Sequence, residues 1–525
     1  MKIVLFAYNA SHYHTSLAIR TLRTALYDLD EPPKTVLLEF SLKDKRDSVL
    51  NALYKEDAEV YGFSAYIWNV TETLAVAESL KKLRPDCKIF FGGPEVSYKA
   101  EEILEKHPFI DTVMTGEGET GIKKLLFFYP DLPKIIVGEP DPVFLSRKPH
   151  YFLNDGTPET LSEGKFIYYE SSRGCPFSCG YCLSGSDCHV TAKTAERTLD
   201  DLYMLEKLPG GKRIVKLVDR TFNYDLPRAN RIIRGLLDEK YTHCYHFEIQ
   251  PSIVDEEMIE VLSLAPKGKF QLEVGIQSTN VSVLRECGRG GSIQKELENL
   301  RLLKALENVP VHVDLICGLP TETFGSIKNS INGVYYLSDE LQIGFLKVLS
   351  GTRIAKDSEK YGIKHKSEPP YEVLCTNTLS YDEIYLLKGI AHTVDRVASS
   401  GKFSLALEFL LGNGDRQGSR TDISNGALNS VQIDTCPSDS TSYPSLNRTR
   451  VTPFDFFSSL SMSLGGSPAA YSQAAMYEKV YLEGLKYVTD NAEREKFLEL
   501  CREDFRRCER TRMPPLLTQG TFQEN

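Results

Sequence analysis

Short apolar runs alternate with segments of helical periodicity along most of this chain, and this alternation constrains its fold more than any other feature. In residues 1–140 the predicted strands are Lys2–Tyr8, Thr35–Phe40, Val60–Ser64, Lys88–Phe91 and Thr112–Met114, and the predicted helices are Thr15–Tyr27, Lys43–Tyr54, Val70–Leu83 and Tyr98–Lys106. Because strands that alternate with helices form parallel sheets covered on both faces, this part predicts a doubly wound, Rossmann-like α/β domain.

The turns after these predicted strands carry residues suited to a ligand site. A doubly wound sheet binds its ligand beyond the carboxyl ends of its strands, and glycine there allows a ligand to approach the backbone. Neither a Gly-x-Gly-x-x-Gly turn after the first strand nor a Walker motif is present. Our candidate cofactor-binding residues are Ser64, Trp68, Gly92, Gly93, Gly116, Glu117 and Gly118. Taken alone, these turns are also compatible with an ordinary α/β domain that has tight connections.

The alternation resumes at residue 166 and continues to about 370. The predicted strands of this second part are Phe166–Tyr169, Ile214–Val218, Tyr245–Ile249, Gln271–Ile276, Val311–Cys317 and Phe345–Leu349. Six βα units suit a partial (β/α)6 barrel, whose chemistry belongs at the carboxyl ends of its strands.

Two other stretches of the chain lack this alternation of strand and helix patterns. A proline-rich run begins near residue 130, and we take residues 141–165 as the linker between the two α/β domains. Residues 371–525 have helical periodicity and predict a mainly helical C-terminal extension, which we expect to cover the barrel mouth. Within it, the stretch near 412–450 is rich in small polar residues and predicts a mobile insertion.

Three cysteines lie in the loop after the first predicted barrel strand. Cys175, Cys179 and Cys182 have the spacing Cys-x3-Cys-x2-Cys, within a segment whose glycines and proline favour a loop. Three thiolates aimed at one point fill three corners of a four-iron cluster and leave one iron open to a small-molecule ligand. Two alternatives stay open at this point: a structural zinc site completed by Cys188 or His189, or unrelated buried thiols.

The cysteine loop resembles the cluster-binding loop of the radical S-adenosylmethionine (radical SAM) superfamily, Cys-x3-Cys-x-aromatic-Cys, with Tyr181 as the aromatic residue. Two predicted strand ends strengthen the resemblance. Glu273-Val-Gly-Ile-Gln-Ser278 resembles the Glu-x-Gly-x-Gln-Ser segment of these barrels, and Asp314-Leu-Ile-Cys-Gly-Leu-Pro320 resembles their Asp-x-Ile-x-Gly-Leu-Pro segment.

This resemblance implies a [4Fe-4S] cluster on the three cysteines, with S-adenosyl-L-methionine (SAM) on the open iron. It further implies that Glu273, Gln277 and Ser278 contact the ribose or methionine side of SAM, and that Gly318 and Glu322 lie near its adenine. Asp219 and Asp314 are weaker candidates, because a charge inside a barrel is often satisfied by a neighbouring arginine or backbone amide.

Placed directly before the cysteine loop, the first domain resembles the cobalamin-binding domain of B12-dependent radical SAM proteins. Its Gly92-Gly-Pro and Gly116-Glu-Gly-Glu turns look like the corrin-contacting turns of that family. Many cobalamin domains carry Asp-x-His-x-x-Gly, whose histidine binds cobalt, but the nearest match here, Asp187-Cys-His189, lacks the glycine and lies in the other domain.

The resemblance therefore implies base-off cobalamin without a histidine ligand, with Trp68 or Tyr66 covering the lower face of the corrin. His12 and His14, in the turn after the first predicted strand, are alternative ligands, although loop histidines are more often solvated or hydrogen-bonded.

The composition limits the partners and the compartment. A net charge of −10 and a pI of about 5.7 argue against nonspecific binding of nucleic acid. No apolar run reaches about 18 residues, so we expect no membrane span. The N-terminal segment begins as a strand pattern rather than a signal peptide, and the scattered cysteines favour a reducing, cytoplasmic location.

Together, these features predict a B12-dependent radical SAM enzyme. The activity that the resemblance implies is methyl transfer to carbon or phosphorus of a small-molecule or peptide substrate, with flavodoxin or ferredoxin as the electron donor. One alternative is a radical cyclase or rearrangement enzyme that resembles the anaerobic magnesium-protoporphyrin monomethyl ester cyclase group. An alternative of another class is a cobalamin or iron–sulfur sensor.

Overall fold

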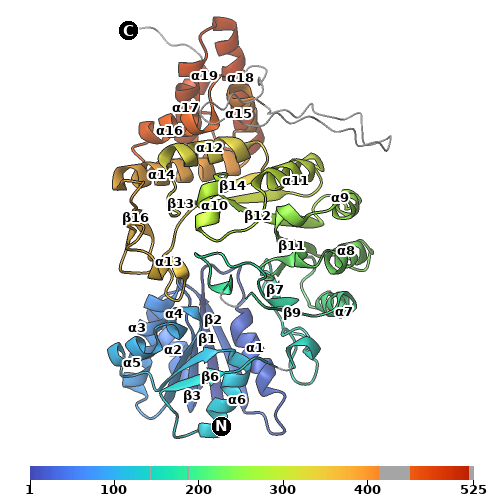
Figure 1. Cartoon of the computed structure of the whole chain (residues 1–525), viewed down its shortest axis with the longest axis vertical. Coiled ribbons are helices and arrows are strands. Elements are labelled where there is room, and N and C mark those ends of the chain that lie inside the picture. Colours follow the sequence, from blue (N-terminus) through green and yellow to red (C-terminus); the bar gives the residue numbers. More distant parts are fainter. Residues whose placement is uncertain (142, 186–187, 413–449, 467, 520–525) are drawn as a thin grey trace.

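The computed structural model describes residues 1–141, 143–185, 188–412, 450–466 and 468–519. The chain is an α/β protein arranged end to end, with a first α/β domain, a central barrel and a group of C-terminal helices (Figure 1). Nearly all of the mobile insertion that we predicted near 412–450 lies outside the described residues.

The first domain is a six-stranded parallel sheet with the order β2-β1-β3-β4-β5-β6. The strands are β1 (Lys2–Asn9), β2 (Lys34–Ser41), β3 (Val60–Ser64), β4 (Lys88–Gly92), β5 (Thr112–Gly116) and β6 (Ile135–Gly138). Each buried strand has apolar side chains on both faces, as expected of a parallel sheet, and the domain has a separate core on each side.

Helices cover both faces of this sheet, which confirms the doubly wound prediction. One core includes α1 (Leu17–Leu26) and α6 (Gly118–Phe128), which pack against each other. The other core includes α2 (Arg46–Glu56), α3 (Val70–Leu83) and the start of α5 (Ala100–Lys106).

Two elements of this domain were not predicted. Helix α6 begins at Gly118, within the Gly116-Glu-Gly-Glu segment, and strand β6 lies inside the proline-rich run that begins near residue 130. Pro130 and Pro133 precede β6 and leave its own amides free to pair with β5. The first prolines of the run therefore precede a strand of the sheet and do not belong to a linker.

The barrel is a second six-stranded parallel sheet, with the order β14-β13-β12-β11-β10-β7. Its strands are β7 (Ile167–Tyr169), β10 (Ile214–Leu217), β11 (Cys244–Ile249), β12 (Phe270–Gln277), β13 (Val311–Cys317) and β14 (Glu340–Phe345). The helices in its connections include α7 (Ala195–Leu205), α8 (Leu226–Gly235), α9 (Glu256–Ser263), α11 (Ile293–Ala305) and α12 (Phe324–Tyr335). The partial (β/α)6 prediction is thereby confirmed.

The predicted sixth barrel strand was displaced. We expected Phe345–Leu349, but β14 ends at Phe345. The strand carries polar side chains such as Gln342 at its exposed positions, so it lacks the continuous apolar run that would predict a strand. The apolar run that follows is a connection whose Leu346 and Val348 are buried, and its backbone pairs with the segment 371–373.

The C-terminal extension is helical, as predicted, and shares one hydrophobic core with the barrel. Its long helices are α14 (Tyr381–Thr393), α16 (Pro453–Ser463), α17 (Gln473–Gly484) and α18 (Asn491–Cys508). Helix α16 packs on α12 and α14, and α14 packs on β14, at the end of the molecule opposite the first domain (Figure 1). These helices lie against the β14 edge, whereas the start of the extension contacts the turn after β13, where the hydroxyl of Thr378 donates to the carbonyl of Glu322 at 2.6 Å. That the extension covers the barrel mouth stays a prediction.

No helix among the described residues combines the length and the apolar composition needed to cross a bilayer.

Candidate cofactor site

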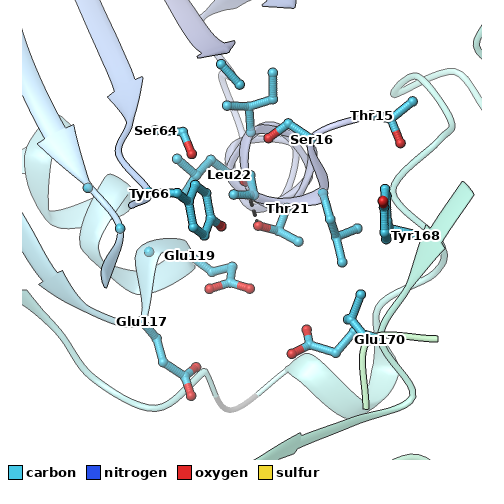
Figure 2. A pocket seen from close by; sticks show the side chains of 18 of the residues that line it. Thr15, Ser16, Thr21, Leu22, Ser64, Tyr66, Glu117, Glu119, Tyr168 and Glu170 are labelled. Carbon is cyan, nitrogen blue, oxygen red and sulfur yellow. Dashed lines mark hydrogen bonds between the residues drawn. The ribbon is translucent and has the colours of Figure 1, made fainter. Parts of the chain in front are cut away.

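A cavity of about 750 Å³ lies where the first sheet meets the barrel (Figure 2). Its walls include the turns after β1, β3, β4 and β5 from the first domain, together with the end of β7 and the turn after β10 from the barrel. The lining includes all seven of our candidates from the first domain, Ser64, Trp68, Gly92, Gly93, Gly116, Glu117 and Gly118. The carboxyl ends of the parallel strands thus converge on one space, as the doubly wound topology requires.

The turn after β3 presents an aromatic pair to this cavity. The rings of Tyr66 and Trp68 stack with centroids 4.5 Å apart and an interplanar angle of 7°. Asn69, which is 1% exposed, fixes the turn by accepting from the Tyr66 amide at 2.8 Å and donating to the carbonyl of Tyr8 at 2.9 Å. The Tyr66 ring lies at the cavity wall (Figure 2), and burial raises the pKa of its hydroxyl.

Two glycines of the predicted set are required by the neighbouring backbone. Gly93 has φ +115°, and a Cβ there would lie 2.4 Å from the carbonyl oxygen of Ala65. Gly116 has φ +70°, and its Cβ would lie 2.1 Å from the carbonyl oxygen of Gly138. These positions therefore need glycine for the packing of their own turns, whatever the cavity holds.

An ion-pair cluster joins the first domain to the strand that leads into the cysteine loop. Arg173 contacts Glu117, just before α6, at 2.8 Å, and Glu119, in the first turn of α6, at 2.7 Å. It also contacts Glu170 in its own segment at 2.8 Å. Burial raises the pKa of the Glu117 carboxyl, and the Arg173 guanidinium opposes this shift. Because Arg173 lies two residues before Cys175, the domain contact and the cysteine loop are mechanically connected.

The cysteine loop is held at its base and at its tip. Its base is the antiparallel pair β8 (Ser172–Gly174) and β9 (Val190–Ala192). At the tip, the Gly180 amide donates to the Cys287 carbonyl at 2.7 Å, and the Gly180 carbonyl accepts from the Ile354 amide at 2.9 Å. A Cβ at Gly180 would lie 2.6 Å from the guanidinium of Arg353, so a side chain there would displace the end of the Arg353 side chain.

Cys175, Cys179 and Cys182 are free thiols, each partly buried. Burial raises the pKa of Cys175, and the neighbouring thiols of Cys182 and Cys179 add to the shift. Within the described residues, no three His, Cys, Asp or Glu side chains are gathered closely enough to hold a metal ion. The donors of this loop fit an iron–sulfur cluster with one open iron, because they are thiols and number three.

Two of the candidates implied to contact SAM are brought together at the barrel ends. The hydroxyl of Ser278 donates to a carboxyl oxygen of Glu322 at 2.6 Å, and both residues are at most 1% exposed. Burial raises the pKa of Glu322 to about 8, although hydrogen bonds from Ser278 and Ser326 oppose the shift. Gln277 lies beside Ser278 at a bulge in the pairing of β12 with β13 and has φ +68°.

The remaining barrel candidates have other surroundings. Gly318, at the end of β13, has φ +88°, and a Cβ there would meet Val373 at 2.7 Å. Glu273 lies in the middle of β12, four residues before the strand ends, and pairs with His246 at 3.2 Å. This hydrogen bond lowers the pKa of Glu273. The structure therefore separates Glu273 from the pair of Ser278 and Glu322.

The two weaker candidates have partners within the barrel. Asp219 is fully buried and accepts from the amides of Ser171 at 2.8 Å and Ser172 at 2.6 Å, so it holds the segment before the cysteine loop. Burial and the neighbouring carboxylate of Glu273 raise the pKa of Asp314 to about 7.

Several residues of the cavity wall were not among our candidate site residues, namely Glu119, Tyr168, Glu170, Arg173 and Arg220. Glu170 and Arg173 flank the cysteine loop, and Glu119 shares a turn with Glu117, so closeness to the motifs is the signal that could have found them. His14, which we had considered, also lines the cavity, and its Nδ1 lies 2.5 Å from the hydroxyl of Tyr168.

The fold defines a class of protein in which a doubly wound domain and a partial barrel share one cavity. A three-cysteine loop lies beside this cavity. The family models agree with this class. The model of the B12 binding domain matches residues 4–126, that of the radical SAM superfamily matches residues 169–332, and that of a protein family of unknown function, DUF4080, matches residues 359–418.

Relatives with curated names point the same way. The cobalamin-dependent radical SAM methyltransferase TokK of Streptomyces tokunonensis is 24% identical over 385 residues, which cover 65% of this chain and 53% of TokK. The 2-(S-pantetheinyl)-carbapenam-3-carboxylate methyltransferase of Streptantibioticus cattleyicolor is 25% identical over 319 residues, which cover 53% of this chain and 45% of that protein. The chain spans about half the length of these relatives.

A solved structure supports the fold. The cobalamin-dependent S-adenosylmethionine radical enzyme OxsB, with aqua-cobalamin and S-adenosylmethionine bound, superposes with a TM-score of 0.61 at 14% identity, covering 96% of this chain and 78% of OxsB. The chain thus carries a match to the B12 binding domain followed by a match to the radical SAM superfamily, and it is similar to proteins named as cobalamin-dependent radical SAM enzymes.

Proposed function

We propose that this protein is a B12-dependent radical SAM enzyme that transfers a methyl group to carbon or phosphorus of a small-molecule or peptide substrate. The observation that carries the proposal is the shared cavity, where the ligand-binding edge of the first sheet faces the segment leading into the three-cysteine loop. The names of the relatives, which are cobalamin-dependent or other methyltransferases, favour methyl transfer over the cyclase and sensor alternatives.

The residues that would hold the cofactors follow from their places in the fold. Cys175, Cys179 and Cys182 would bind a [4Fe-4S] cluster, and the ends of β12 and β13 at Ser278 and Glu322 would bind SAM. The cavity residues that would hold cobalamin are Ser64, Trp68, Gly92, Gly93, Gly116, Glu117 and Gly118, with Gln277, Gly318 and Glu273 as further contacts to SAM. When bound, these groups supply one-electron reduction of SAM and a carrier for its methyl group.

The protein's own contribution is positioning and the exclusion of water. Arg173 holds the turn of Glu117 and Glu119 against the cysteine loop, so that groups bound to the two domains face each other across one cavity. The neutral carboxyl of Glu322, whose pKa is about 8, keeps the hydroxyl of Ser278 in place at neutral pH. Both arrangements are formed in advance of binding, which lowers the cost of ordering the site.

We further propose that cobalamin binds base-off without a histidine ligand, with the Tyr66 and Trp68 stack beneath the corrin. Tyr66 and Trp68 both belong to the cavity wall, and Trp68 is 50% exposed. His14 is the histidine of the described cavity wall, and its contact with Tyr168 competes with binding to cobalt. An electron donor such as flavodoxin or ferredoxin would supply the electrons.

Anaerobic turnover of SAM tests the proposed function. The full chain, reconstituted with iron, sulfide and cobalamin, should convert SAM to S-adenosylhomocysteine or 5′-deoxyadenosine under a low-potential reductant, as measured by liquid chromatography with mass spectrometry. The Co(II) resonance of the same preparation should show no nitrogen coupling from histidine. Replacement of Cys175, Cys179 and Cys182 by Ala should abolish turnover. Bound cobalamin without turnover under any reductant would instead favour a sensor.

A further inference from the structure

The side chain of Thr221 lies against the cysteine loop. Its hydroxyl oxygen is 3.6 Å from the sulfur of Cys175, within reach of a hydrogen bond to sulfur. Thr221 is 6% exposed and comes from the turn after β10, so it is 46 residues away from Cys175 in the sequence. No motif marks it, and neither the proposed SAM contacts nor the proposed cobalamin contacts use it.

The turn that carries Thr221 is held on both sides. Two residues before it, the fully buried Asp219 accepts from two consecutive backbone amides of the segment before the cysteine loop, at 2.8 and 2.6 Å. Two residues after it, Asn223 and the backbone of Gln250 exchange two hydrogen bonds of 2.9 Å. The position of the hydroxyl relative to Cys175 is therefore set before any cluster binds.

The direction of this hydrogen bond depends on the state of the cysteine. In the thiol form, Cys175 can donate to the hydroxyl of Thr221, which itself donates to the carbonyl of Arg220 at 2.8 Å. A cysteine bound to iron is a thiolate, which has no proton and can only accept. Rotation of the hydroxyl hydrogen toward sulfur then makes Thr221 the donor.

We propose that Thr221 donates a hydrogen bond to the Cys175 thiolate and thereby makes the cluster easier to reduce; this inference rests on the proposed function. Reduction adds negative charge to the cluster and to its sulfur ligands. A hydrogen bond to a charged acceptor is stronger than one to a neutral acceptor, so the donor stabilises the reduced state more than the oxidised state. Hydrogen bonds to the sulfurs are among the factors that set the potential of iron–sulfur clusters.

The test is a redox titration of the anaerobically reconstituted full chain, with the resonance of the reduced cluster followed by electron paramagnetic resonance. Thr221→Val keeps the shape of the side chain and removes the hydroxyl, so its cluster should have a more negative midpoint potential than the wild type. Thr221→Ser restores the donor and should titrate close to the wild type. Thr221→Ala, which lacks the donor without adding bulk, should shift in the same direction as Thr221→Val.

Thr393→Val is the matched control. Thr393 is fully buried, donates to a carbonyl at 2.7 Å and lies in α14, so its replacement should leave the potential unchanged. An unchanged potential in Thr221→Val with full iron content would overturn the proposal. Failure of both Val and Ala variants to assemble a cluster would also overturn it, because the hydroxyl would then serve assembly. Absence of a cluster in the wild type would instead contradict the proposed function itself.

Discussion

At the scale of single residues, the most perturbed carboxyl of the proposed SAM site is Glu322. Because the pKa of its folded form is about 8, it keeps its proton in the folded chain at pH values where the unfolded chain has lost it. Its contribution to stability is therefore present at pH 4 and is lost as the pH rises through 8. Each unit of pKa shift corresponds to about 1.4 kcal/mol.

This linkage predicts the behaviour of Glu322→Gln, which keeps an acceptor for the hydroxyl of Ser278 and cannot ionise. The variant should be more stable than the wild type at pH 8.5, by a few kcal/mol at most, and the difference should shrink toward pH 5. Thermal unfolding of both proteins between these pH values measures it. A stability difference between the two proteins that stays constant across this pH range would contradict the prediction. It would show that Glu322 loses its proton at the same pH in the folded and unfolded chains.

The sequence indicated which residues of the turns matter, but it did not indicate why the structure needs them. The glycines at 93 and 116 were singled out for access of a ligand, yet the backbones of Ala65 and Gly138 already exclude any side chain there. Glu273 was placed with Gln277 because they share a motif. A strand advances about 3.3 Å per residue, so four residues separate them by about 13 Å along β12.

At the scale of elements, the contact between the turn after β5 and β8 depends on one guanidinium. Arg173→Ala would leave Glu119, whose side chain is 7% exposed, and Glu117 without their shared cation. Breaking a fully buried pair costs about 3–5 kcal/mol, and the 24% exposure of the Arg173 side chain reduces this to about 2 kcal/mol. We expect lower thermal stability and weaker retention of cobalamin, measured by unfolding and by the corrinoid spectrum after gel filtration.

Arg46→Ala is the control for this prediction. Arg46 pairs with Glu72 at 2.6 Å within the same domain, but both side chains are more than 40% exposed, so the loss should be below about 1 kcal/mol and cobalamin should stay bound. Equal behaviour of the two variants would mean that Arg173 is an ordinary surface ion pair.

Helices and strands with a strong apolar periodicity were predicted with the correct bounds, whereas a strand with polar side chains was not. Val60–Ser64, Val70–Leu83 and Val311–Cys317 have the predicted bounds, because their apolar patterns end where the chain turns. Strand β14 was displaced by five residues because it is an edge strand with polar side chains, whereas the apolar residues after it are buried in an irregular connection. The contact of Thr221 with Cys175 joins separate strands and leaves no periodic signal in the sequence.

At the scale of the whole molecule, the architecture separates the two proposed metal centres into different domains that share one cavity. Their binding should therefore be separable by substitution. Joint replacement of Cys175, Cys179 and Cys182 by Ala removes the thiols and leaves the walls supplied by the first domain in place. That variant should lose its iron and its visible cluster absorbance while it keeps a corrinoid spectrum.

Gly93→Val is the reciprocal change. Its φ of +115° is unfavourable for a β-branched residue, and a Cβ 2.4 Å from the Ala65 carbonyl forces the turn after β4 out of place. This variant should lose cobalamin and keep iron, because Gly93 belongs to the first domain and the cysteine loop is fixed separately at Gly180 by Cys287 and Ile354. Iron per chain and bound corrinoid are measured on the same preparations. Loss of both groups in either variant would show that the two domains bind their cofactors as one cooperative unit, with the cavity forming only when both are present.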